Sequence, residues 1–187
     1  MGRIVVTEFV SLDGVMEDPG GAENFEHGGW SFEISRGDEG DDFKLEETMA
    51  SDALLLGRVT YEGFAAAWPS REGEFADKFN AMPKYVVSST LQEPPWTNST
   101  VLRGDVRDEA ARARDRHEGD VVVHGSATLV QALLEHDLVD ELRLMVFPVV
   151  LGAGKRLFGS TSDKKRLRLV ETRVVGDGVA IMRYERT

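Results

Sequence analysis

Three short segments of the chain combine glycine, hydroxyl and arginine side chains directly after an apolar, strand-like run. They follow residues 53–56, 85–87 and 121–123, and they contribute Gly57, Arg58 and Thr60, then Ser88 and Ser89, then Gly125, Ser126, Ala127 and Thr128. Helix N-termini at such turns offer free N–H groups to phosphate, glycine allows close backbone approach, and arginine supplies a planar fork. Three such turns favour a nucleotide with several phosphates, although the spacing alone fits ordinary helix capping equally well.

Other motifs that carry chemistry are missing. Residues 152–155, Gly-Ala-Gly-Lys, lack the first glycine and the Ser/Thr of a phosphate loop, and no Gly-x-Gly-x-x-Gly follows a strand. The four histidines lack the spacing of metal ligands, and the chain has no cysteine. We therefore expect no metal site, no disulfide and no cysteine nucleophile.

The strands and helices that must position these turns are visible in the pattern. Strands are predicted over 3–10, 53–56, 85–88, 101–102, 121–123 and 140–151, with two more between 167 and 184 joined by a Gly-Asp-Gly turn at 176–178. Helices are predicted over 41–51, 60–68, 72–82, 105–117 and 126–135. Strands alternate with helices and antiparallel strands close the chain, which predicts an α/β fold with one mixed sheet flanked by helices. No change in composition marks a boundary, so residues 1–187 are expected to form one domain.

Residues 13–40 form the longest predicted loop, which is rich in Gly, Asp and Glu. Loops of this length inside a compact domain are usually functional lids or disordered, and Phe25, Trp30 and Phe32 argue against disorder. We therefore predict a lid over the substrate pocket. Trp30 either anchors this lid and stacks on a planar substrate, or is a fixed core residue of a permanently packed loop.

The composition limits the partners. The chain has 187 residues with 22 Lys+Arg and 33 Asp+Glu, a net charge of −11, which argues against binding to nucleic acid. No apolar run approaches the roughly 20 residues that a membrane helix needs. The N-terminus lacks the apolar region of a signal peptide, so a cytoplasmic protein without membrane or nucleic-acid partners is expected.

The order of the motifs resembles a known superfamily. Residues 57–62 (Gly-Arg-Val-Thr-Tyr-Glu), 86–89 (Val-Val-Ser-Ser) and 123–126 (Val-His-Gly-Ser) resemble the NADPH-binding turns of the dihydrofolate reductase superfamily. Residues 11–14 (Ser-Leu-Asp-Gly) and 148–154 (Pro-Val-Val-Leu-Gly-Ala-Gly) look more like its other branch, the reductase domain of riboflavin biosynthesis, or RibD C-terminal domain. The resemblance spans nearly the whole chain. It implies a dihydrofolate reductase-like three-layer fold, with a mostly parallel central sheet of eight strands, an antiparallel C-terminal edge and helices on both faces.

The resemblance also implies NADPH as the cofactor. In the family, the turn that falls on residues 57–60 contacts the phosphates, and its arginine, here Arg58, helps to hold the adenosine 2′-phosphate. Ser88 and Ser89 fall on a serine pair that faces the same 2′-phosphate. The turn 125–128 falls where the family cradles the pyrophosphate. Dihydrofolate reductases usually have consecutive glycines there, so the Gly-Ser-Ala of this chain weakens the folate reading.

The substrate side has several candidate carboxylates. Folate enzymes of the superfamily place one carboxylate on the first helix, and Asp41, 16 positions before Gly57, has the spacing of such an acid. Asp42 and Glu46 compete with it, and Asp13 follows the first strand at the mouth of the same crevice. Asp13 or Asp41 could orient a water that supplies a proton. Alternatively, Asp41 is only an N-cap and Asp13 only a turn residue.

These features together predict an NADPH-dependent reductase. It would transfer hydride to a C=N or C=O group of a small polar heterocyclic or sugar-like substrate, in a reaction similar to that of 5-amino-6-(5-phosphoribosylamino)uracil reductase. A non-catalytic or regulatory nucleotide-binding protein on the same fold, or a dihydrofolate reductase, is the alternative. A homodimer is expected, because residues 142–151 look apolar on both faces and proteins of the riboflavin branch are typically dimers.

Overall fold

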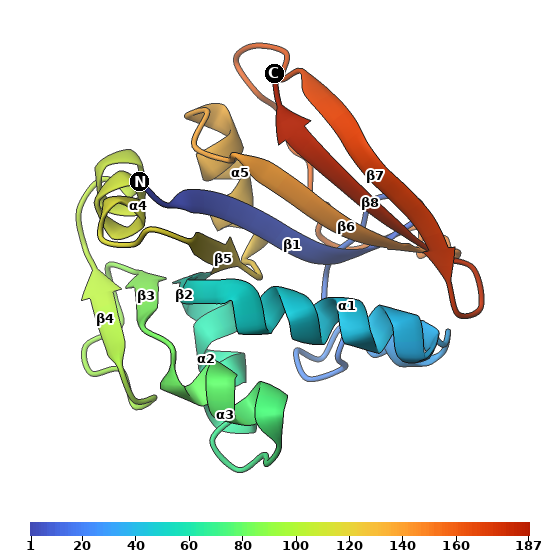
Figure 1. The fold of residues 1–187 in the computed structure, drawn as a ribbon, viewed down its shortest axis with the longest axis horizontal. Coiled ribbons are helices and arrows are strands. Elements are labelled where there is room, and N and C mark those ends of the chain that lie inside the picture. The colour runs from blue at the N-terminus through green and yellow to red at the C-terminus, as the bar shows by residue number, and fades with distance from the viewer.

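A single mixed sheet forms the centre of the molecule in a computed structural model that describes residues 1–187 (Figure 1). The strand order is β4-β3-β2-β5-β1-β6-β8-β7. The six strands from β4 to β6 are parallel, and β8 and β7 continue the sheet antiparallel. This confirms the predicted α/β fold class and its antiparallel C-terminal edge. The strands are β1 Arg3–Ser11, β2 Ser51–Gly57, β3 Lys84–Val87, β4 Ser99–Leu102, β5 Asp120–Val123, β6 Glu141–Phe147, β7 Leu167–Val175 and β8 Val179–Arg186.

Helices cover both faces of the sheet and bury three apolar clusters. On one face, α4 and α5 pack on a core of 21 buried residues. On the other face, α2 and α3 bury a cluster around Tyr61 and Phe79, while α1 and the turn at Trp30 bury another around Phe147. None of these helices has the length and hydrophobicity that a membrane crossing requires. The helices are α1 Gly37–Ala50, α2 Arg58–Ala67, α3 Glu74–Ala81, α4 Val106–Asp115 and α5 Ala127–Glu135, with a short 3₁₀ turn at Trp30–Phe32.

Helix starts differ from the sequence prediction where no side-chain cap marks them. Asp105 caps α4 as predicted, since its carboxylate accepts the N–H groups of Arg107 and Asp108. The first helix, however, begins at Gly37 rather than Asp41. Arg36 stands at its N-cap position and makes no capping hydrogen bond with its side chain. The prediction that Asp41 is its N-cap is therefore wrong.

The C-terminal hairpin forms as predicted and also holds the start of α1. Its turn contains Gly176 and Gly178, both with positive φ. A Cβ on Gly176 would overlap the carbonyl oxygen of Ser35, and the Asp177 N–H donates to that same oxygen. Glycine is thus required at position 176 by close contact as well as by backbone conformation.

Strand β5 ends earlier than its neighbours, which shapes the carboxyl edge of the sheet. The β1–β5 pairing stops at Val6↔Val123, whereas the β1–β6 pairing continues to Ser11↔Phe147. On the other side, β2 pairs with β5 only as far as Leu54, although β2 itself runs on to Gly57. We call the place where β1 and β2 extend past β5 the strand-end region.

The opposite edge of the sheet is closed by paired charges. Arg3 and Arg143 both bond to Asp120, while Glu141 accepts from Arg3, Arg143 and Arg183. The Glu141 side chain has no exposed surface, and Arg143 is nearly buried. Each of these five charges therefore has a partner of opposite sign.

Candidate functional site

Two helix N-termini meet at the strand-end region, because the turns after β2 and β5 touch. The N–H of Gly57 donates to the carbonyl oxygen of Gly125 at 3.1 Å. A Cβ on Gly57 would overlap the Ser126 hydroxyl, and one on Gly125 would lie 2.8 Å from Thr60 Oγ1. Only glycine therefore fits at both positions. The first-turn N–H groups of α2 and α5 lie close together here, an arrangement suited to binding phosphate groups.

The β5–α5 turn uses its side chains for structure and leaves its backbone for a ligand. Ser126 caps α5, with its hydroxyl oxygen accepting the N–H of Leu129 at 3.4 Å. Ala127 is buried and Thr128 is exposed. The structure thus places the predicted pyrophosphate residues in one turn, and the expected binding groups there are N–H groups with the Thr128 hydroxyl.

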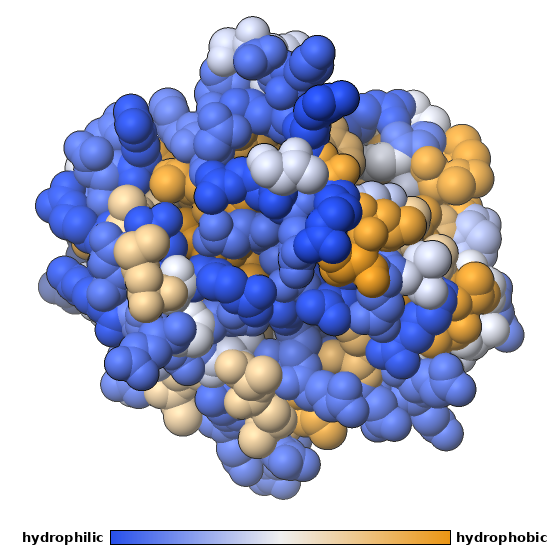
Figure 2. Space-filling model, turned by 45° about the horizontal axis from the view of Figure 1, so that its top comes forward, coloured by the Kyte–Doolittle hydropathy of each residue, from blue (hydrophilic) through white to orange (hydrophobic).

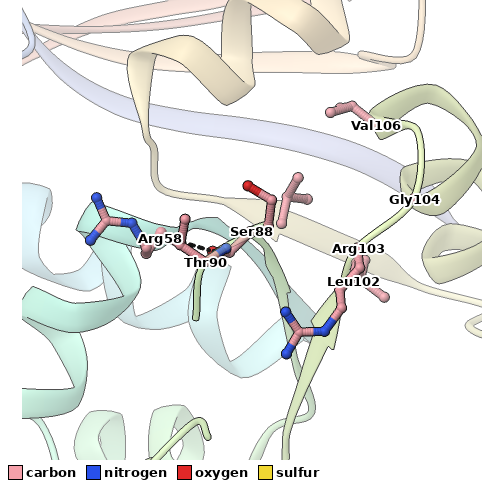
Figure 3. A pocket seen from close by; sticks show the side chains of 9 residues that line it. Arg58, Ser88, Thr90, Leu102, Arg103, Gly104 and Val106 are labelled. Carbon is pink, nitrogen blue, oxygen red and sulfur yellow. Dashed lines mark hydrogen bonds between the residues drawn. The ribbon is translucent and has the colours of Figure 1, made fainter. Parts of the chain in front are cut away.

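A cavity of about 470 Å³ lies beside these turns (Figure 3). It brings together Arg58 from the start of α2 with Ser88 and Ser89 from the end of β3, the three residues that the resemblance assigns to the 2′-phosphate. It also contains a second arginine, Arg103, which sequence reasoning missed. Figure 3 shows the two arginines on either side of Ser88 and Thr90. The lining residues are Arg58, Val87, Ser88, Ser89, Thr90, Leu102, Arg103, Gly104 and Val106.

The two serines of this cavity have different tasks. The Ser88 hydroxyl oxygen accepts the N–H groups of Thr90 and Leu91, at 3.2 and 3.0 Å, and the residue is nearly buried. The same hydroxyl also lies 3.4 Å from Thr90 Oγ1, so Ser88 shapes the turn. Ser89 is exposed on the same wall, with its hydroxyl available to a ligand.

Both arginines of the cavity already have partners. Arg58 Nη1 donates to Glu62 Oε2 at 2.8 Å, one turn along α2, and both side chains are nearly half exposed. Arg103 Nη2 donates to the carbonyl oxygen of Leu91 at 2.7 Å. An arginine has five N–H donors, so each guanidinium keeps donors for an anionic ligand.

Asp13 joins two segments that are distant in the sequence through hydrogen bonds. Its carboxylate accepts from the Ser11 hydroxyl at 2.6 Å, the Leu151 N–H at 3.1 Å and the Gly152 N–H at 2.9 Å. The bonds from Ser11 and Gly152 lower the pKa of Asp13 from 3.8 to about 2. At neutral pH Asp13 is therefore ionised and cannot donate a proton. Of the two alternatives, the structure fits a turn residue, and the two segments that resemble the riboflavin branch meet through it.

The candidate acids of the first helix lie on its outer side. Asp41, Asp42 and Glu46 are exposed, and Asp41 pairs with Arg36. None of them lines the cavity that contains Arg58, and their catalytic and substrate-binding roles stay predictions. Their place on the outer side follows from the rotation of the helix, whose inner face carries Lys44 and Glu47.

A polar cluster that the sequence did not predict fills the space under α1. Lys44 Nζ donates to Thr7 Oγ1 at 2.8 Å and to Glu47 Oε2 at 3.0 Å, and the Thr7 hydroxyl donates to Glu47 at 2.9 Å. His124, directly after β5, lies near them and contacts the ring of Phe79, with centroids 5.5 Å apart. Burial and the Lys44 cation hold the pKa of His124 well below 6.5, so this histidine is neutral. We call Thr7, Lys44, Glu47 and His124 the α1 polar cluster.

Trp30 belongs to the core. It is only 1% exposed, its ring meets Phe147 edge to face at 5.4 Å, and its Nε1 donates to the Glu17 carbonyl oxygen at 2.9 Å. No face of the indole is left for a substrate. Of the two hypotheses for Trp30, the structure supports a fixed core residue. It does not support a lid anchor that stacks on a substrate.

Comparison with known proteins identifies relatives over nearly the full length. The family model of the RibD C-terminal domain matches residues 3–181. The uncharacterized protein YyaP of Bacillus subtilis is 28% identical over 187 residues, which cover 97% of this chain and 94% of YyaP. A second uncharacterized protein of that organism, YwjB, is 28% identical over 172 residues, which cover 92% of this chain and 91% of YwjB.

Solved structures share the fold at low sequence identity. A Shewanella protein named for riboflavin biosynthesis has a TM-score of 0.81 at 23% identity, over 99% of each chain. A pyrimidine reductase-like protein of Corynebacterium diphtheriae has a TM-score of 0.64 at 14% identity, over 99% of this chain and 92% of that one. Acinetobacter baumannii RibD has a TM-score of 0.66 at 17% identity, over all of this chain and 58% of RibD. With this fold and the match over residues 3–181, the chain belongs to the RibD C-terminal domain family, a reductase-like family of the dihydrofolate reductase fold.

Proposed function

We propose that the protein is an NADPH-dependent reductase acting on a C=N or C=O group of a small polar heterocyclic or sugar-like substrate. The observation that carries this proposal is the cavity that joins Arg58, Ser89 and Arg103 beside the paired turns at Gly57 and Gly125. Two guanidinium groups that line one cavity suit a phosphomonoester, and the N–H groups of the paired turns suit a pyrophosphate. NADP carries both groups.

The residues present fit this cofactor. Gly57 and Gly125 leave no room for a Cβ because the two turns pack against each other, which holds the N-termini of α2 and α5 together for phosphate groups. Arg58 and Arg103 would hold the 2′-phosphate, which NADH lacks. When bound, the cofactor supplies the hydride; the protein supplies position and electrostatics.

The α1 polar cluster supports a polar substrate rather than a folate. A folate enzyme needs an unpaired carboxylate on the first helix to hold the pterin, as the resemblance implies. Here the inward carboxylate, Glu47, is bonded to Lys44 and Thr7. We infer that Lys44, together with the neutral His124, presents donors to a substrate with oxygen or nitrogen acceptors.

Two measurements test the proposed function. Titration of the protein with NADPH, followed by the change in nicotinamide fluorescence, should show saturable binding that is tighter than for NADH. Oxidation of NADPH, followed by its absorbance, should then begin with one member of a panel of cyclic imines, pyrimidines and open-chain sugar derivatives. Binding without oxidation by any member would favour the nucleotide-binding alternative, and failure to bind NADPH would refute both.

We also propose that the protein is a homodimer, on different grounds from those of the sequence. Within residues 142–151, β6 is buried on both faces in one copy of the chain, whereas Val150, beyond its end, is 66% exposed. The edge strand β7, however, exposes Leu169 and Val174, at 45% and 68%. Figure 2 shows apolar side chains gathered on the side where β7 and β8 lie in Figure 1. Such an edge is suited to pairing with a second copy.

Light scattering tests the dimer. The expected mass is twice the 20.7 kDa of one chain, and Val174→Lys should lower it toward the monomer. A monomer mass for the unmodified protein at every concentration would contradict the proposal.

A further inference from the structure

One buried acid has no role in the structure as described so far. Glu8 lies near the middle of β1, between Val6 and Val10, and is 7% exposed. Its Oε1 is the one buried side-chain nitrogen or oxygen in the molecule without a hydrogen-bond partner. An unpaired polar atom in the interior costs free energy, and a carboxylate costs far more than a carboxylic acid. A group of this kind needs an explanation beyond packing.

The position of Glu8 connects it with the strand-end region. Val6 and Val123 form the last β1–β5 pair. Glu8 is two residues beyond Val6, and Gly125 is two residues beyond Val123, so both lie directly past the end of β5. Gly125 is part of the turn that the proposed function assigns to the cofactor. Glu8 therefore lies on β1 at the level where the phosphate-binding turn leaves the sheet.

Burial, rather than the neighbouring charges, favours the protonated form of Glu8. Burial raises the pKa of Glu8 well above 4.5; the Lys44 cation opposes this shift and the Glu47 carboxylate adds to it. Both of these charged groups come from α1, and they are bonded to each other. Burial therefore shifts the Glu8 carboxyl toward its neutral form, which has one O–H donor.

The other carboxylates of the site, Asp13 and Glu47, are already occupied as hydrogen-bond acceptors. Asp13 is ionised and its oxygens are occupied by Ser11, Leu151 and Gly152. His124 is neutral, and Glu47 accepts bonds from Lys44 and Thr7.

We propose that Glu8 is the proton donor of the reduction. This proposal rests on the proposed function. The acceptor carbon of C=N or C=O takes a hydride, with its two electrons, from the reduced nicotinamide dinucleotide, which is thereby oxidised. The acceptor nitrogen or oxygen takes the proton from the Glu8 carboxyl, the carboxyl O–H bond breaks, and Glu8 is left as a carboxylate. Water returns the proton before the next turnover.

The test compares Glu8→Gln, which removes the acidic proton and keeps the shape, with Glu118→Gln as a matched control. Glu118 is exposed beside the start of β5, at the opposite edge of the sheet. Infrared spectra of protein labelled with ¹³C-glutamate at neutral pH should show the carbonyl stretch of a protonated carboxylic acid. The band should be lost in Glu8→Gln, kept in Glu118→Gln, and shifted when NADPH fills the site.

Binding and turnover complete the test. The Kd of Glu8→Gln for NADPH should lie within about threefold of that of the unmodified protein. Its rate of NADPH oxidation with the acceptor found in the panel should fall about 10²- to 10⁴-fold, which is the usual contribution of a general acid. If NADPH binds but the protonated-carboxyl band is absent, or is unmoved by NADPH, or if Glu8→Gln turns over normally, Glu8 is not the donor although the proposed function stands. If the unmodified protein does not bind NADPH, the proposed function falls and the assignment of Glu8 falls with it.

Discussion

The cavity proposed to hold the nucleotide leads to a direct prediction about cofactor selection. Arg58 lines the cavity with Ser89 and Arg103, and in the proposed complex its guanidinium pairs with the 2′-phosphate of NADPH. NADH has a hydroxyl at that position. We therefore expect Arg58→Ala to weaken the binding of NADPH and to leave the binding of NADH almost unchanged.

The magnitude follows from the partners of Arg58 in the free protein. A charge-assisted hydrogen-bonded pair is worth about 1.5–3 kcal/mol. Arg58 is 44% exposed and already pairs with Glu62 at 2.8 Å, an i,i+4 pair worth about 0.3–0.5 kcal/mol that competes with the phosphate. The net loss expected for Arg58→Ala is about 1–2.5 kcal/mol, or about 5- to 70-fold in Kd for NADPH.

The assay is a fluorescence titration of each variant with both cofactors at one salt concentration. Arg71→Ala is the matched control, because Arg71 is an exposed arginine on the ring of Trp68, after the far end of α2. Glu62→Gln should improve NADPH binding about twofold, because it removes the competing carboxylate. Equal losses for NADPH and NADH in Arg58→Ala would show that Arg58 does not contact the 2′-phosphate and would refute the reasoning.

Three further predictions concern stability. Trp30→Ala should lower the free energy of unfolding, measured by urea titration, by about 3–5 kcal/mol. Phe32 lies in the same turn and is 80% exposed, so Phe32→Ala should change this free energy by less than about 0.5 kcal/mol. Similar values for both variants would contradict a core role for Trp30. The pKa of Asp13 is lowered to about 2 in the folded protein, so its stabilising contribution is present above pH 3.8 and is lost as the pH falls toward 2. In Asp13→Asn, the free energy of unfolding should therefore depend less on pH between 3.8 and 2. The pKa of Glu8 is higher in the folded protein than in the unfolded chain, so the free energy of unfolding should fall as the pH rises above 4.5. If Glu8→Gln shows the same dependence of this free energy on pH, another group titrates there.

The tight turns at Gly57 and Gly125 could be predicted because their requirements are local. A strand that ends in a tight turn beside another turn needs glycine, and Gly57 and Gly125 appear in the sequence for that reason. Strand periodicity and the Gly-Asp-Gly turn similarly predicted the sheet and its hairpin edge. These signals lie within a few residues of the feature that they predict.

The inner face of α1 could not be predicted in the same way. Which carboxylate faces the sheet depends on where the helix begins and how it is rotated, and its start at Gly37 carries no capping side chain. Lys44 and Glu47 are residue types that are almost never buried unless paired, so their types suggest a solvent-facing side. Their burial is explained only by each other and by Thr7, which lies 37 positions before Lys44.

Long-range partners account for the other omissions. Asp13 finds Leu151 and Gly152 nearly 140 residues later, and Arg103 reaches the cavity because β4 pairs with β3. Neither position has a local pattern that distinguishes a site residue from an ordinary surface residue. Such residues can be recognised only once the sheet order is known.

The early end of β5 links the two halves of the proposed site. Because β5 stops at Val123, its turn reaches Gly57 and forms the paired N-termini for the phosphates. The same early end leaves residues 7–11 of β1 paired only with β6, so the part of β1 that carries Thr7 and Glu8 is not covered by a strand on its other side. A β5 longer by two residues would pair with Thr7 and Glu8 and move the glycine turn away from Gly57. The length of β5 therefore determines both how the cofactor is anchored and how the buried acid is reached. We expect insertions after Val123 to abolish NADPH binding and, at the same time, to alter the protonated-carboxyl band of Glu8.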